Sequence, residues 1–118
     1  MKSDIIKNLI KKEEKKGVKE LRVGGYGKQK PRSLGFNGNR KTFTPDLVAL
    51  YEDRRDLFSV ENKVVKSNIK DLIAKWILFG LEARKHGGRL YVVVPEKDRK
   101  KCEEIIEQKQ LSAELITV

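Results

Sequence analysis

The apolar run Leu90-Tyr91-Val92-Val93-Val94 constrains the fold of this 118-residue chain more than any other segment. Five consecutive apolar residues are typical of a strand that is buried on both faces. Helical patterns flank this run, over residues 68–86 before it and residues 96–109 after it. Connections that cross over through a helix place successive strands parallel in one sheet, with a right-handed crossover. The sequence therefore predicts an α/β fold.

The remaining apolar patterns complete a single domain over residues 1–118. Apolar residues recur at helical spacing over residues 2–16, which predicts a first helix. We expect a short strand at 18–23, an antiparallel hairpin at 47–65 and a last strand at 113–118. The predicted architecture is a mixed central sheet flanked by helices on both faces, with an extra helix and strand at the C-terminus.

The chain is strongly basic, with 27 Lys and Arg residues against 17 Asp and Glu residues and a net charge of +10. An excess of this size favours binding to polyanions, although a lysine-rich solvated surface is the alternative explanation. Residues 21–45 are rich in glycine and contain no acidic residue, and we expect a mobile basic loop there with a broken hairpin inside it. The residues predicted to contact the phosphates of a nucleic acid are Lys28, Lys30, Arg32, Arg40, Lys41 and, beyond this segment, Lys66.

Several function classes do not fit the sequence. The single cysteine, Cys102, excludes an internal disulfide and a cysteine-based zinc site, and we expect it to be buried in a helix. The single histidine, His86, lies at a predicted helix end, where a favourable interaction with the helix C-terminus explains it. No apolar stretch approaches the ~20 residues that span a bilayer, and no secretory signal is evident. We expect a soluble, cytoplasmic protein.

One acidic-x-Lys motif differs in context from the others. Five positions match this pattern, but only Glu61-Asn62-Lys63 lies in a predicted strand rather than on an amphipathic helix. Alternation in a strand directs Glu61 and Lys63 to the same face. If the hairpin turn centres on residues 53–54, Asp46 lies directly opposite Glu61, with Cβ atoms ~5 Å apart. Two such carboxylates predict a divalent cation between them, whereas the alternative is a cross-strand salt bridge with Lys63.

These residues resemble the signature of the PD-(D/E)XK nuclease superfamily. The resemblance rests on Thr44-Pro45-Asp46-Leu47-Val48 followed by Ser59-Val60-Glu61-Asn62-Lys63, and on an element order similar to that family's αβββαβ core. It implies a restriction-endonuclease-like fold and Mg²⁺-dependent cleavage of DNA, with Mn²⁺ expected to substitute. It further implies that Asp46, Glu61 and the Asn62 carbonyl ligate the metal and that Lys63 assists the attacking water. Several members add a glutamate from the first helix, for which Glu13 is the candidate.

The Gly-rich segment before Asp46 is similar to that of archaeal-type Holliday-junction resolvases, and phage-type replication-repair nucleases are similarly small. We therefore expect structure-selective cleavage of branched DNA. The alternatives are a catalytically inactive nucleic-acid-binding protein with the same fold, and a small ribosome-associated or chaperone-like basic protein. The run Trp76-Ile77-Leu78-Phe79 cannot be buried on one helical face, with Leu78 expected to point away from the core. This pattern motivates a homodimer hypothesis.

Overall fold

The computed structural model describes residues 2–36 and 41–118 and is built on a five-stranded mixed sheet. Its strands lie in the spatial order β1-β4-β5-β6-β7. Strands β1, β4 and β5 pair antiparallel, whereas β5, β6 and β7 pair parallel. Their bounds are Glu20–Arg22 for β1, Leu47–Leu50 for β4, Arg55–Val60 for β5, Leu90–Val94 for β6 and Ala113–Thr117 for β7.

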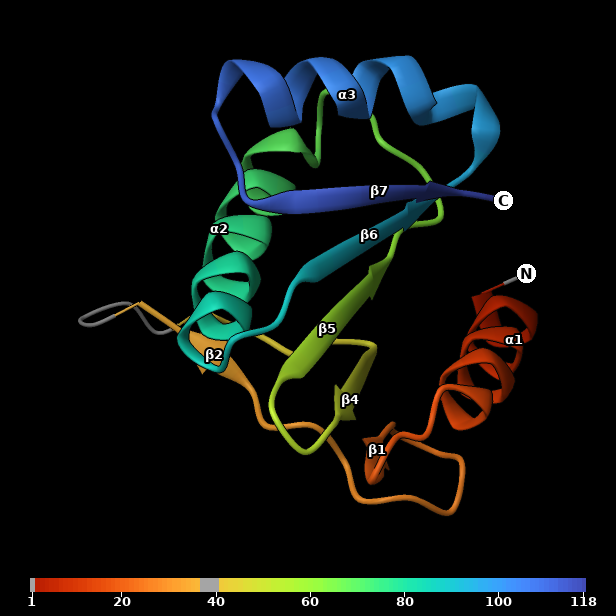
Figure 1. The fold of residues 1–118 in the computed structure, drawn as a ribbon. Coiled ribbons are helices and arrows are strands. Elements are labelled where there is room, and N and C mark those ends of the chain that lie inside the picture. Colours follow the sequence, from red (N-terminus) through yellow and green to blue (C-terminus); the bar gives the residue numbers. More distant parts are fainter. Residues whose placement is uncertain (1, 37–40) are drawn as a thin grey trace.

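Helices cover both faces of this sheet (Figure 1). Helix α1 (Lys2–Lys15) lies on one face, where Ile6 and Leu9 join a buried apolar cluster with β1, β4 and β5. Helix α2 (Ile69–Lys85) and helix α3 (Arg99–Gln108) share the cluster on the opposite face. A short 3-10 helix, η1, precedes α3 over Glu96–Asp98. The predicted mixed sheet, flanking helices and additional C-terminal helix and strand are confirmed.

The basic segment before β4 contains a small second sheet. Strands β2 (Leu34–Gly35) and β3 (Thr42–Phe43) pair antiparallel, which confirms the broken hairpin expected in this segment. Leu34 and Phe43 pack against the cluster beneath α2. These two side chains therefore anchor the segment to the α2 face of the sheet.

The register of the β4–β5 hairpin differs from the prediction by two residues. Leu47 pairs with Phe58, so Asp46 lies next to Ser59 rather than opposite Glu61. The turn closes earlier than expected because the Tyr51 N–H donates to the carbonyl of Arg54 (2.8 Å) and the Arg54 guanidinium lies over the Tyr51 ring. Strand β5 also ends at Val60, five residues before the predicted end.

Helix α2 ends at a tight approach between its C-terminus and β5. The Gly88 N–H donates to the Ala83 carbonyl, and Gly87 adopts a φ of +73° that favours glycine. A Cβ atom on Gly88 would come within 1.8 Å of the backbone oxygen of Arg55. A residue larger than glycine at position 88 would therefore displace the β5 backbone.

The apolar side chains of α2 are arranged differently from the prediction. Trp76 and Phe79 are buried, but Leu78 packs partly buried against the core, whereas Ile77 and Leu81 are exposed. The expected outward position of Leu78 is therefore wrong, and the homodimer stays a prediction. None of the helices in residues 2–36 and 41–118 has the length and apolar content for a membrane crossing.

Candidate active site

Asp46 lies where the hydrogen-bond ladder between β4 and β5 ends. Its backbone N–H donates to the Phe58 carbonyl (3.0 Å), and its side-chain Oδ2 accepts the N–H of Val60 (2.7 Å). A side-chain oxygen thus takes the place of the next ladder carbonyl and fixes the carboxylate beside the end of β5. The other oxygen, Oδ1, lies 2.9 Å from the Nζ atom of Lys2 in α1.

Glu61 follows directly after β5 and turns toward α2. Its backbone N–H still donates to the Val93 carbonyl of β6 (2.8 Å), which holds the residue at the sheet. Its Oε2 atom accepts hydrogen bonds from the Ser59 hydroxyl (2.6 Å) and the Trp76 indole (3.1 Å), and lies 2.7 Å from the Lys75 ammonium. The Glu61 carboxylate is therefore buried, and the loss of water around its Oε2 atom is compensated by two hydrogen bonds and an ion pair.

Two opposing effects set the protonation of Glu61. Burial by itself raises the pKa of this carboxyl group, because desolvation disfavours the charged form. The charge and hydrogen bond of Lys75, with the hydrogen bonds from Ser59 and Trp76, outweigh the burial and lower the pKa below its ordinary value. Glu61 is therefore an anion at neutral pH.

The second oxygen of Glu61, Oε1, is open to a further ligand. None of the described residues donates to it. Among the described residues, every fully buried side-chain oxygen or nitrogen has a hydrogen-bond partner. Oε1 has none, so it must be in contact with solvent. An open carboxylate oxygen is a ligand that suits a hard cation such as Mg²⁺. Both oxygens of Asp46 already have partners, the Val60 N–H and the Lys2 ammonium, so a cation at Asp46 would displace Lys2. No group of three or more His, Cys, Asp and Glu side chains that could hold a metal occurs among residues 2–36 and 41–118.

The rest of the acidic-x-Lys motif lies outside the strand. Asn62 and Lys63 are both exposed, in the segment that leaves β5. The Lys63 carbonyl accepts a hydrogen bond from the Asn68 amide (3.2 Å), but none of the described residues forms an ion pair with the Lys63 ammonium. The expectation that Glu61 and Lys63 share a strand face is therefore wrong, because β5 ends before both of them.

Glu13 faces the sheet as expected but lies away from Asp46. Its carboxylate is 1% exposed and accepts a hydrogen bond from the Tyr51 hydroxyl (2.6 Å), with Lys16 3.4 Å away. Tyr51 follows Asp46 by five residues of extended chain, which corresponds to about 16 Å. The structure therefore does not bring Glu13 together with Asp46 and Glu61. Burial, together with the hydrogen bond and charge of Glu13, raises the pKa of Tyr51.

Sequence reasoning missed the residues that hold Glu61 and the segment after it. Lys75 lies at the rim of the apolar face of α2, where a partly buried lysine requires a counter-ion. This position was the signal in the sequence that could have identified Lys75 as the partner of a carboxylate. Beyond Glu61, Asp98 accepts the Val64 N–H (3.3 Å) and Lys101 donates to the Val64 carbonyl (2.9 Å). Contacts from α2, η1 and α3 thus fix both Glu61 and the chain that leaves β5.

The predicted DNA-contacting residues are spread over several elements. Lys30, Arg32 and Lys66 are exposed. Lys28 lies 3.9 Å from Glu14 of α1, and Lys41 lies 2.8 Å from Asp71 of α2. Arg40, also predicted to contact phosphates, lies outside the described residues.

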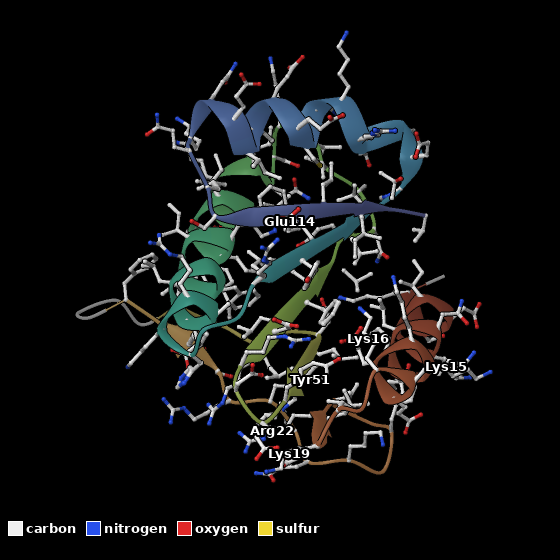
Figure 2. The ribbon with its side chains drawn as sticks, viewed as in Figure 1. Lys15, Lys16, Lys19, Arg22, Tyr51 and Glu114 are labelled. Carbon is white, nitrogen blue, oxygen red and sulfur yellow. The ribbon has the colours of Figure 1, made fainter. Side chains whose placement is uncertain are left out.

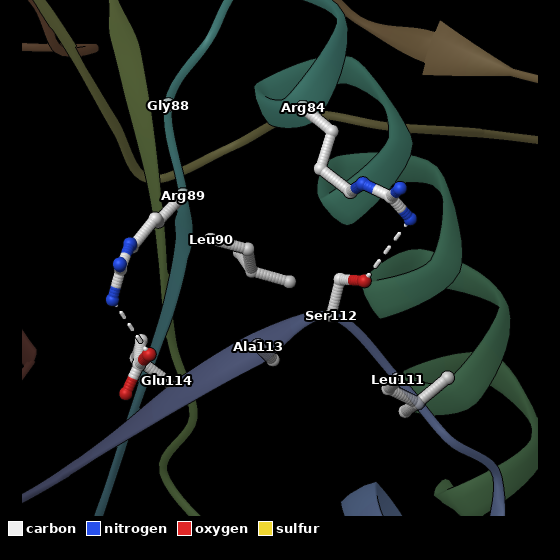
Figure 3. Close-up of a pocket in the computed structure, with 8 residues that line it drawn as sticks. All are labelled: Arg84, Gly88, Arg89, Leu90, Leu111, Ser112, Ala113 and Glu114. Atoms are coloured by element: carbon white, nitrogen blue, oxygen red, sulfur yellow. Dashed lines mark hydrogen bonds and ion pairs between the residues drawn. The ribbon is translucent and has the colours of Figure 1, made fainter.

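A cavity of about 320 Å³ lies at another part of the sheet, between the C-terminal end of α2 and the start of β7 (Figure 3). Arg84 donates to the Ser112 hydroxyl (3.4 Å) and Arg89 pairs with Glu114 (2.9 Å) in its wall. Both arginines already have protein partners. The cavity shares no lining residue with the Asp46–Glu61 site.

No protein-family model, curated protein or solved structure matches this chain.

Proposed function

We propose that this protein is a metal-dependent endodeoxyribonuclease of the PD-(D/E)XK kind, which hydrolyses phosphodiester bonds in branched DNA. One observation carries the proposal. The Asp46 carboxylate accepts a hydrogen bond from the backbone N–H of Val60, the residue next to Glu61, so two acidic residues lie at the adjoining ends of β4 and β5. The element order α1, β1, β4, β5, α2, β6 supports it, because that order resembles the αβββαβ core of the superfamily.

Asp46, Glu61 and the backbone carbonyl of Asn62 are the groups that would hold Mg²⁺, and Mn²⁺ would use the same ligands. A bound divalent ion at such a site polarises the phosphate and lowers the pKa of a bound water. Lys75 keeps Glu61 ionised and oriented through its 2.7 Å contact. Lys63 is exposed two residues further on, so its ammonium is available to offset the phosphate charge or to assist the attacking water.

A binding protein without turnover is the second candidate. The observation that favours it is that each carboxylate already lies within 3 Å of a lysine, Asp46 beside Lys2 and Glu61 beside Lys75. In that case the two ion pairs serve stability alone. The high positive charge would still bind DNA through its phosphates.

A cleavage assay separates these two functions. Labelled four-way junction, flap, duplex and single-stranded DNA are incubated with the protein in Mg²⁺, Mn²⁺ or EDTA. We expect Mg²⁺-dependent cleavage that is strongest on branched DNA and is lost in Asp46→Asn and Glu61→Gln. Glu114→Gln is the matched control, because Glu114 forms an exposed ion pair with Arg89 far from the site. Salt-sensitive binding without cleavage in any metal would support the binding protein instead.

A further inference from the structure

The positive charge of the chain is concentrated in its first quarter. Residues 2–32 contain eleven Lys and Arg residues against four Asp and Glu residues, so this segment carries +7 of the net +10. It forms α1, β1 and the loop that precedes β2. These elements occupy one side of the molecule, and Figure 2 shows Lys15, Lys16, Lys19 and Arg22 together there.

Three lysines of α1 form a stripe that points directly away from the sheet. Lys7, Lys11 and Lys15 are all exposed and are spaced four residues apart. At 100° per residue they fall opposite the buried face of the helix, which contains Ile6 and Leu9. None of the three forms an ion pair with a described residue. In Figure 2 the Lys15 side chain accordingly extends outward from the helix.

This stripe is unfavourable for the helix itself. Like charges four residues apart destabilise a helix by about 0.2–0.5 kcal/mol per pair. The exposed surface of α1 also contains Asp4 and Glu14, but Glu14 lies 3.9 Å from Lys28, and three lysines against one aspartate leave the stripe with net positive charge. The unbalanced charge therefore indicates a polyanionic partner.

We propose that the outer stripe of α1, defined by Lys7, Lys11 and Lys15, is a binding track for the phosphate backbone of duplex DNA. This inference rests on the proposed nuclease function. The track and the site share one helix, because Lys2 at the start of α1 contacts Asp46 from the side of the helix opposite the stripe. From Lys2 to Lys15 the helix rises about 20 Å, so a strand bound along it leads away from the carboxylates as one arm of the substrate.

An anionic membrane is a less suitable partner for this stripe. Membrane-surface helices bury an apolar face between the lipid head groups. The apolar residues of α1 instead pack against the sheet, and its outward stripe contains no large apolar side chain. Contacts from lysines without apolar insertion are those used for a nucleic-acid backbone.

The test measures DNA affinity as a function of salt in EDTA, where no cleavage occurs. Wild type is compared with K7Q/K11Q/K15Q and with the control K97Q/K100Q/K109Q, which removes three exposed lysines near and within α3. Binding of a labelled 30-base-pair duplex and a four-way junction is followed by fluorescence anisotropy. Because each released phosphate contact contributes a slope of about −0.9 to log K against log salt, we expect the α1 variant alone to lose about three units of slope.

Each outcome decides the proposal. A reduced slope and at least tenfold weaker binding in the α1 variant only, with an unchanged urea midpoint, supports the track. Equal losses in both triple variants, or none in either, overturn the track, while Mg²⁺-dependent cleavage by wild type would leave the nuclease function standing. If the wild type does not bind DNA but binds phosphatidylserine vesicles, both the track and the nuclease function are overturned.

Discussion

Replacing Lys75 with methionine isolates the contribution of one ion pair to this fold. In the folded protein the Glu61 carboxylate is 8% exposed, and Lys75 is the one cation within 4 Å of it among the described residues. Methionine retains much of the aliphatic stem of lysine but removes the charge. The variant therefore leaves a buried carboxylate with only the Ser59 hydroxyl and the Trp76 indole as donors.

The expected loss of stability is about 3 kcal/mol. Breaking one partner of a buried ion pair costs about 3–5 kcal/mol, because the remaining charge is left uncompensated. The lower end applies here since the Lys75 side chain is 17% exposed and water can partly replace it. That loss is a large fraction of the about 5–15 kcal/mol that stabilises a typical domain. The double variant Glu61→Gln with Lys75→Met should recover most of it, because neither charge then remains.

Urea unfolding followed by Trp76 fluorescence measures these values directly, since Trp76 is the single tryptophan and donates to Glu61. The pH dependence of stability gives a second measurement, in which wild type and Lys75→Met should change in opposite directions. In wild type the pKa of Glu61 is lowered, so its contribution is present above the ordinary value of 4.5 and is lost as the pH falls through the lower folded value. In Lys75→Met the burial is opposed only by the hydrogen bonds from Ser59 and Trp76, so we expect the pKa of Glu61 to rise and stability to increase as the pH falls from 7 toward 5.

Lys41→Met is the matched control, because the Lys41–Asp71 pair is more than half exposed and should contribute about 1 kcal/mol or less. A loss below about 1 kcal/mol in Lys75→Met would refute the reasoning. So would a double variant whose loss equals the sum of the two single losses, because the charges would then act independently.

Three further predictions concern other parts of the fold. Gly88→Ala should lower the free energy of unfolding in urea by about 1–3 kcal/mol, because its Cβ overpacks against the β5 backbone, whereas Gly24→Ala, which has open space, should be nearly neutral. Tyr51→Phe should cost about 2 kcal/mol in urea unfolding, because the buried Glu13 carboxylate loses its hydrogen bond; an unchanged midpoint would contradict this. Burial raises the pKa of the Cys102 thiol to about 11, so a thiol reagent at pH 8 should label it only in urea, and rapid labelling of the folded protein would show it accessible.

Apolar periodicity was sufficient to predict the elements of the fold. The strand over residues 90–94 matches the prediction residue for residue, and the three long helices match within three residues at each end. The register of the β4–β5 hairpin could not be predicted in the same way. A shift of two residues leaves every side chain on the same face, so the alternation of apolar residues fits both registers. The deciding contacts are the turn hydrogen bond and the ring contact between Tyr51 and Arg54.

The candidate site was predicted only in part, because local patterns mark residues but not the contacts between distant elements. Asp46 and Glu61 were found because a motif and a strand marked them, and the structure places them at adjoining strand ends. The partner of Glu61 was not found, because Lys75 comes from a helix that docks on the sheet; its position at the rim of the apolar face calls for a counter-ion but does not say which carboxylate supplies it. Helical phase correctly predicted that Glu13 faces the sheet, but it does not say which end of the sheet a residue reaches.

The separation in sequence between the carboxylates and their lysines has a consequence for the order of assembly. Asp46 and Glu61 are fifteen positions apart, joined by a local hairpin of the kind that forms within about 1–10 μs. Their counter-charges, Lys2 and Lys75, arrive only when α1 and α2 dock on opposite faces. The hairpin can therefore close before either carboxylate has its counter-charge, and the two ion pairs form only as α1 and α2 dock on the sheet.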